Sequence, residues 1–236
     1  MTDAPDEGIR LAKRVAALAG CSRREAELLI ENGAVRVDGQ AALLPQSRVR
    51  AHQLVEIESG ARPEPVVPVT LLLHKPAGMP TDNAHRLLVA ANHHEPERAG
   101  LRFLQRHVAA QRCMTPLETG ASGLVVFTQE FRVERKLHED AGTMENEVMV
   151  DVAGPVGPGV IDRLERAPAR VSIGQQAEGH TGLRFAITGA RPGQIAHLCD
   201  ESGLRILAMK RIRIGRVPLA GLLAGQWRYL LPNERF

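Results

Sequence analysis

The segment from Pro116 to Thr128 holds the residue of this sequence with the clearest chemical potential, the carboxylate of Glu118. Glu118 follows a leucine and precedes a run of small residues, which leads into the apolar stretch Leu124–Phe127. A carboxylate in such a turn can act as a nucleophile or a general base. It can equally be an exposed turn carboxylate, because glutamates are abundant on protein surfaces. Taken without further context, the segment favours the exposed carboxylate.

Histidines are the other residues that could do chemistry, as ligands of a metal ion. The candidates are His85, His93, His94 and His107. None of them stands at helical i, i+4 spacing with a carboxylate, and adjacent histidines point apart on any regular element. We therefore expect surface histidines in loops and no metal site.

Composition limits the class of protein. The chain has 236 residues, of which 44% are hydrophobic, enough for one large domain or for a small and a medium one. Aromatic residues make up only 3%, so any base-stacking surface must be small or built from arginine planes. Cys21, Cys113 and Cys199 lie far apart, which favours neither structural zinc nor disulfides and fits a reducing cytoplasm. With no secretory pattern or long apolar run, we expect a cytoplasmic protein without a membrane segment.

The N-terminal region predicts two short helices followed by a small sheet. Leu11, Val15 and Leu18 share one face of a first helix that Gly20 would end. Ser22 and Glu25 are spaced as a capping box at the start of a second helix. The later signals are Asn32-Gly33 as a helix end, Val35-Arg36-Val37 as a strand, Asp38-Gly39 as a hairpin turn and residues 53–58 as a second strand.

This arrangement resembles the S-four-type RNA-binding domain. The resemblance is carried by residues 10–13, 22–27 and 35–39, with Ala12 where serine is common. Five basic residues and no acidic one stand between residues 10 and 24, a charge that attracts RNA phosphates. The alternative is that these charges only solvate a helix face, and the motif favours RNA binding. The candidate RNA contacts of this region are Arg10, Lys13, Arg14, Arg23, Arg24 and Arg36.

A proline-rich stretch divides the chain. Residues 60–68 contain three prolines and no periodicity, which predicts a stiff, extended linker. We therefore predict domains at residues 1–62 and 69–236. The second domain opens with a buried strand, Val69–His74, that breaks at the turn Lys75-Pro76-Ala77-Gly78. Later predicted elements are a strand at 184–188, a helix from Gln194, a basic strand at 209–215 and a core position for Trp227.

These elements, together with the Glu118 segment, resemble the ribosomal RNA pseudouridine synthases that carry an S-four-type domain. That family has Arg-Leu-Asp before a Thr-Ser-Gly-Leu run, an Asn-Lys-Pro-x-Gly turn and a Gly-x-Trp-Arg-x-Leu close. The matching segments here are residues 116–118, 121–124, 74–78 and 225–230, and the resemblance extends from Ile9 to Glu234. It implies that Glu118 stands where an aspartate acts on a flipped uridine, with neither a metal nor an organic cofactor.

The resemblance also shows departures around this position. The family arginine two residues before the carboxylate is Pro116, and the threonine of the following turn is Ala121. The family's Lys-x-Tyr pair is Asn146 and Val148, and three arginines of a Gly-x-Asn-Arg-Gln-Ile-Arg-Arg segment are Gly193, Ala196 and His197. Glutamate adds a methylene that moves the carboxylate oxygens by ~1.5 Å, and a misplacement of ~1 Å can cost about a hundredfold in rate. Greatly reduced or lost activity is expected.

We therefore expect an α+β fold, with a small N-terminal RNA-binding domain and a larger domain built on a mixed, mostly antiparallel sheet. The expected function is that of a cytoplasmic, monomeric protein that binds ribosomal RNA and has reduced or lost isomerase activity. Two alternatives stay open: an active uridine isomerase that uses Glu118, and a ribosome-assembly or translation-associated RNA binder. The second set of candidate RNA contacts is Lys75, Lys210, Arg211 and Arg213.

Overall fold

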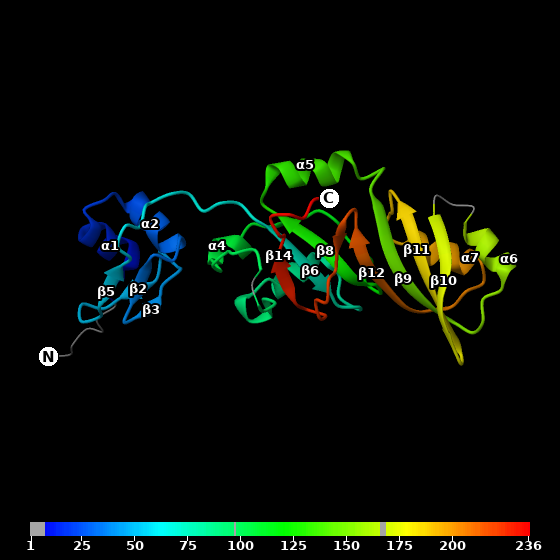
Figure 1. Cartoon of the computed structure of the whole chain (residues 1–236). Coiled ribbons are helices and arrows are strands. Elements are labelled where there is room, and N and C mark those ends of the chain that lie inside the picture. Colours follow the sequence, from blue (N-terminus) through cyan, green and yellow to red (C-terminus); the bar gives the residue numbers. More distant parts are fainter. Residues whose placement is uncertain (1–7, 97, 166–168) are drawn as a thin grey trace. The chain divides into compact units, whose positions relative to one another are not determined.

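The computed structural model describes residues 8–96, 98–165 and 169–236, and the chain divides into two compact units (Figure 1). The first unit contains the chain up to Pro68 and also Arg102–Ala110, while the second contains Val69–Leu101 and Gln111–Phe236. The finer limits of 1–62 and 69–236 stay predictions. In the described ranges, no helix has the length and apolar character needed to cross a membrane.

Among its described residues, the first unit contains three helices and two small sheets, where the sequence predicts two helices and one small sheet. Its elements are β1 (Ile9–Arg10), α1 (Leu11–Ala19), α2 (Arg23–Glu31), β2 (Val35–Val37), β3 (Gln40–Ala41), β4 (Arg48–Val49), β5 (Val55–Ile57) and the short helix α4 (Gln105–Val108). The strand order is β3-β2-β5 in one sheet, and β1 pairs with β4 in the other.

Local signals determine where these elements begin and end. Gly20 ends α1 with a φ of 63°. Ser22 and Glu25 form the predicted capping box, with bonds of 2.8 and 3.2 Å between each backbone N–H and the other side chain. Asp38 and Gly39 adopt φ values of 51° and 77°, the left-handed pair that a tight hairpin requires. The prediction that Leu18 joins the apolar face is wrong, since it lies in the last turn of α1 and is 52% exposed.

The second unit is built on a nine-stranded sheet with the order β10-β11-β9-β12-β8-β6-β14, where β13 pairs with β12 and β7 with β8. The strands are β6 (Thr70–Lys75), β7 (Arg112–Cys113), β8 (Ser122–Thr128), β9 (Glu145–Ala153), β10 (Ala169–Ala177), β11 (His180–Thr188), β12 (Ile206–Ile214), β13 (Val217–Pro218) and β14 (Trp227–Tyr229). The helices are α3 (Thr81–Ala84), η1 (His85–Leu87), η2 (Ala90–Asn92), α5 (Phe131–Glu139), α6 (Pro158–Leu164) and α7 (Gln194–Glu201).

The sheet is mixed and mostly antiparallel, which confirms the predicted fold class. Among the strand pairs in the described chain, β8–β12 is the parallel one, and its register joins Ser122 to Lys210 and Gly123 to Arg211. Gly123 has a φ of 121°, and a Cβ added there would lie 2.3 Å from the carbonyl oxygen of Arg211. Glycine is therefore needed where these two strands meet.

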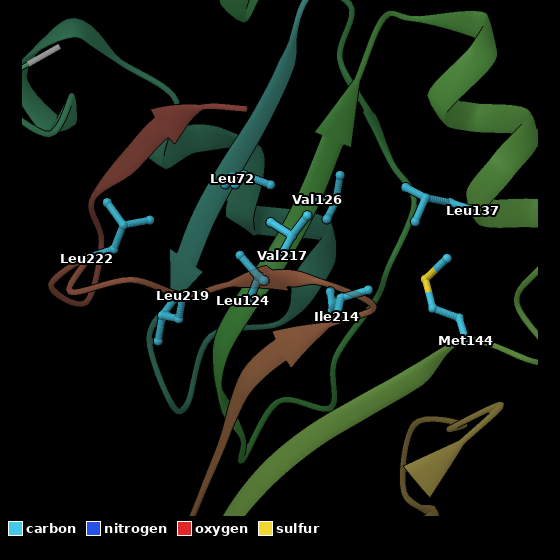
Figure 2. Close-up of a cluster of buried hydrophobic side chains, with 9 residues drawn as sticks. All are labelled: Leu72, Leu124, Val126, Leu137, Met144, Ile214, Val217, Leu219 and Leu222. Atoms are coloured by element: carbon cyan, nitrogen blue, oxygen red, sulfur yellow. The ribbon is translucent and has the colours of Figure 1, made fainter. Parts of the chain in front are cut away.

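A cluster of buried apolar side chains holds β6 and β8 in place (Figure 2). Leu72 of β6 pairs with Val126 of β8, and Leu137 brings helix α5 against the cluster. The members are Leu72, Leu124, Val126, Leu137, Met144, Ile214, Val217, Leu219 and Leu222. Because β8 is packed in this way, the C-terminal end of the loop that precedes it is held in a fixed position.

Trp227 confirms the predicted core position at the edge of the sheet. Its side chain is 0% exposed, and its indole N–H donates to the carbonyl oxygen of Val89 at 2.8 Å. The ring of His93 lies 4.4 Å from the Trp227 ring, centroid to centroid. Strand β14 is thereby fixed to the η2 region as well as to β6.

Candidate functional site

One row of residues crosses four strands of the sheet next to the Glu118 segment. Lys75 of β6 pairs with Gly123 of β8, Gly123 pairs with Arg211 of β12, and Arg211 pairs with Val148 of β9. Residues paired across strands share a face of the sheet. The row therefore brings two cations and Val148 to the same face, with a glycine between the cations.

Both cations of this row are buried and bonded to backbone oxygens. Lys75 is 0% exposed, and its ammonium donates to the carbonyl oxygens of Pro76 at 2.9 Å, Met79 at 2.7 Å and Thr119 at 3.4 Å. Arg211 is 7% exposed, and its guanidinium donates to the carbonyl oxygens of Thr115 at 2.5 Å, Leu124 at 2.8 Å and Pro116 at 3.4 Å. Both groups are therefore bonded within the chain and shielded from solvent, and their role as RNA contacts stays a prediction.

The loop that carries Glu118 is fixed on both sides of that residue. Thr81 of α3 makes two hydrogen bonds to the backbone of Leu117. Its hydroxyl donates to the Leu117 carbonyl at 2.6 Å and accepts from the Leu117 N–H at 3.1 Å. The N–H of Gly78 donates to the Thr119 carbonyl at 2.7 Å. Glu118 is half-buried between these anchors, so it is not the exposed turn carboxylate that the segment alone favours.

The carboxylate of Glu118 acts on both buried cations. Burial lowers the pKa of Arg211 to about 10, and the nearby Glu118 carboxylate opposes this change. Burial likewise lowers the pKa of Lys75, again against the influence of Glu118, while Arg211 lowers it further. Glu118 therefore serves as a counter-charge for two cations that lie away from water.

A small hollow lies at this point of the second unit. Its cavity volume is about 30 Å³, close to the space of a single water molecule. It is lined by Pro116, Leu117, Glu118, Val148, Ala190, Arg191, Pro192, Ile195, Met209 and Arg211. The hollow thus brings together the Glu118 loop, strands β9 and β12, and the turn before α7.

Arg191 differs from the other charged residues of the hollow because it is exposed. Its guanidinium makes no hydrogen bond or ion pair with any residue in the described chain, although its backbone N–H donates to the side-chain oxygen of Gln194 at 3.1 Å. The site therefore has a free cation at its rim and a bound cation, Arg211, at its floor.

The opposite face of the same strands carries a ladder of ion pairs. Arg213 of β12 bonds the carboxylates of Glu145 and Glu147 at 2.6 and 2.7 Å. Glu145 also pairs with Arg170 at 2.5 Å, and Glu147 with Arg184 at 2.6 Å. Arg213 is thus occupied by two carboxylates, whereas its neighbour Lys210 is exposed and stays a candidate RNA contact.

In the first unit, the predicted RNA contacts lie near the starts of the two helices. Arg10 stands at the N-cap position of α1 without a side-chain capping bond, and Lys13 and Arg14 follow one turn later. Arg23 and Arg24 open α2 with exposed side chains, and both lie near Glu27, at 3.4 and 3.6 Å. Arg36 lies apart on β2 and pairs with Glu58 at 3.8 Å. Exposed ion pairs of this kind are weak, so these cations can exchange their partners for phosphates.

The histidines do not form a metal centre in the described part of the chain, where no group of three or more potential ligand side chains comes together. The prediction that all four lie on the surface is wrong for two of them. His107 is 4% exposed, and the side chain of His93 is 8% exposed. His93 fills space beside Trp227, and burial lowers the pKa of His107.

Comparisons with known proteins agree with the arrangement of the two units. The family model of the S4 domain matches residues 9–55. The chain is 25% identical to an uncharacterized RNA pseudouridine synthase of Aquifex aeolicus, over 96% of this chain and 94% of that protein. It is 29% identical to ribosomal large subunit pseudouridine synthase B of Pseudomonas aeruginosa, over 99% of this chain and 64% of that protein. This chain is an S4-domain homologue of the RNA pseudouridine synthases.

A solved structure supports the same fold. The crystal structure of a pseudouridylate synthase aligns with a TM-score of 0.55 at 18% identity, over 94% of this chain and 96% of that one. The fold predicted from the resemblance is thereby confirmed.

The residues that depart from the synthase pattern fall in different places. Pro116, Glu118 and Val148 line the hollow, so three of the departures meet at one point. Asn146 is buried outside it and donates to the carbonyl oxygen of Met144 at 3.3 Å. Gly193, where the resemblance predicts an arginine, adopts a φ of 82°.

Sequence reasoning missed two residues of this site. Thr81 gave no signal, because its partner Leu117 is 36 residues away in the chain. Arg191 did offer one, because it stands two positions before Gly193, where the synthase arginine is missing. The structure places Arg191 in the lining of the hollow, which its position in the sequence alone does not reveal.

Proposed function

We propose that this chain is an RNA-binding protein with ribosomal RNA as its partner, and that its uridine isomerase activity is greatly reduced or lost. RNA binding is supported by the S4 domain, by homology to RNA pseudouridine synthases and by the exposed cations at the starts of α1 and α2. The loss of activity is the finer part of the proposal and depends on the hollow at Glu118.

The size and lining of this hollow carry the proposal. Pockets that enclose a small molecule usually measure roughly 300–1,000 Å³, whereas this one is about 30 Å³. Val148 contributes an apolar wall without the flat aromatic face on which a base would stack. A flipped uridine would find neither the space nor the stacking partner that the reaction needs.

The position of Glu118 points in the same direction. Its charge favours the protonated forms of Arg211 and Lys75, and both cations donate to backbone carbonyls. An extra methylene relative to aspartate displaces the oxygens in a loop whose backbone is fixed by Thr81 and Gly78. The carboxylate is thus suited to balance charge and poorly placed to attack a sugar or a base.

Isomerisation can be mapped by carbodiimide-dependent reverse-transcription stops on ribosomal RNA. RNA would be compared from cells with the wild-type gene, from deletion cells, and from deletion cells supplied with Glu118→Gln or Glu118→Asp. We expect no stop that depends on the wild-type protein, because the hollow excludes the base. Glu139→Gln, an exposed glutamate of α5, serves as the matched control.

An active isomerase is the second candidate, because a carboxylate is retained in the hollow. It would be shown by a stop that disappears on deletion and returns with the wild type and Glu139→Gln but not with Glu118→Gln. That pattern would overturn the proposed loss of activity and leave the RNA-binding part intact.

A further inference from the structure

The turn before α7 holds the backbone of Arg191 rigidly. The N–H of Arg191 donates to the Gln194 side-chain oxygen at 3.1 Å, and the Gln194 N–H donates to the Arg191 carbonyl at 3.1 Å. Pro192 restricts the backbone between them. The guanidinium therefore projects from a preorganised turn, which lowers the entropic cost of binding a ligand there.

The conformation of the turn explains why a cation is found at 191 and not at 193. Gly193 has a φ of 82°, a backbone conformation that side chains other than glycine adopt only with strain. An arginine at 193 would therefore strain the turn that starts α7. Arg191 lies two residues earlier without a left-handed backbone, and it reaches the same hollow.

The charges around the hollow favour an anion at its rim. Among the lining residues, Arg191 and Arg211 are cationic and Glu118 is anionic. Lys75 adds a second buried cation close to Glu118. Glu118 is already matched by the buried cations, so the exposed charge of Arg191 has no counter-charge in the described chain.

We propose, on the basis of the RNA binding proposed above, that Arg191 binds a backbone phosphate of the RNA at the mouth of the Glu118 hollow. A guanidinium binds phosphate with charge-assisted, often bidentate hydrogen bonds. The phosphate stays outside the hollow, so the site holds RNA without admitting a base. The second unit then contributes its own contact in addition to those of the S4 domain.

The test is the salt dependence of RNA binding by the full chain, measured by fluorescence anisotropy with a labelled RNA stem-loop that has uridines in its loop. The slope of log K against log salt is negative. Arg191→Ala should reduce its magnitude by about 0.7–0.9, the value of one phosphate contact. Arg191→Lys should keep the wild-type slope. Arg205→Ala is the matched control, because Arg205 is exposed and lies just beyond the other end of α7.

Two results would count against the proposal in different ways. If the wild type binds and Arg191→Ala gives the same slope as Arg205→Ala, the phosphate site is overturned and the proposed RNA binding stands. If the wild type does not bind RNA in any salt, the proposed function fails and the phosphate site fails with it.

Discussion

Lys75 and Arg211 lie away from water, and both are close enough to Glu118 for its charge to favour their protonated forms. Removal of that charge leaves two buried cations with only carbonyl partners. We expect Glu118→Gln to lower the free energy of unfolding by about 1–3 kcal/mol, less than for a fully buried ion pair because Glu118 is half-buried. Urea denaturation of the purified variant measures this change.

The control for this prediction is Glu139→Gln, which removes an exposed carboxylate paired with Arg135 at 3.5 Å. Exposed pairs of this type contribute about 0–1 kcal/mol. Equal midpoints and slopes for the two variants would show that Glu118 has no structural role at the hollow.

The burial of these cations also marks a limit of sequence-based prediction. Residues 209–215 alternate, which predicts a common face for Arg211 and Arg213. The strand pairing shifts between them, so that Arg211 pairs with Val148 and Arg213 with the adjacent residue, Glu147. This bulge sends the two arginines to opposite faces, one into the site and one into the ion-pair ladder. No local signal in the sequence indicates the shift.

At the scale of elements, the ion-pair ladder connects four strands of the sheet. Arg170 lies on β10, Arg184 on β11, Glu147 on β9 and Arg213 on β12. Arg213 and Arg184 hold the pKa of Glu147 at about 2, well below its usual range, mainly through the hydrogen bond from Arg213. The side chain of Glu147 is only 12% exposed, so solvent screens its ion pairs less than it screens the more exposed pair of Arg170 with Glu145.

The lowered pKa gives the ladder a defined pH dependence. A carboxylate with a lower pKa in the folded state stabilises the fold above its unfolded pKa, and this stabilisation is lost as the pH falls through its folded pKa. For Glu147 the loss falls between about pH 5 and pH 2. We expect Glu147→Gln to cost about 1–2 kcal/mol at pH 7 and to flatten the acid limb of the stability curve. Thermal unfolding from pH 7 to pH 2 would measure both effects, and an acid limb as steep as in the wild type would contradict the assignment.

The elements that could be predicted are those with local signals. The capping box of Ser22 and Glu25 and the turn at Asp38-Gly39 involve residues within three positions of each other, so their chemistry can be read directly. Strand β10 and helix α5 were not predicted from the sequence. Most of β10 is exposed on both faces, so it lacks the alternating apolar pattern on which a strand prediction depends.

At the scale of the whole molecule, each unit has exposed cations that could contact the proposed RNA partner. The first unit has the exposed arginines of α2, and the second has Arg191 and Lys210. The S4 match covers residues 9–55, and the Glu118 site lies in the second unit. Contacts in separate units contribute independently to the salt slope, because each phosphate contact releases its own counterions.

The share of the first unit can be measured with Arg23→Ala combined with Arg24→Ala. Both side chains are more than 60% exposed, and their pairs with Glu27 at 3.4 and 3.6 Å are weak enough to yield to a phosphate. Loss of two phosphate contacts should reduce the magnitude of the negative slope of log K against log salt by about 1.4–1.8. The control is Arg132→Ala combined with Arg135→Ala on α5, which removes the same charge from another exposed helix face. If both double variants changed the slope equally, net charge and not the S4 helix pair would explain the affinity.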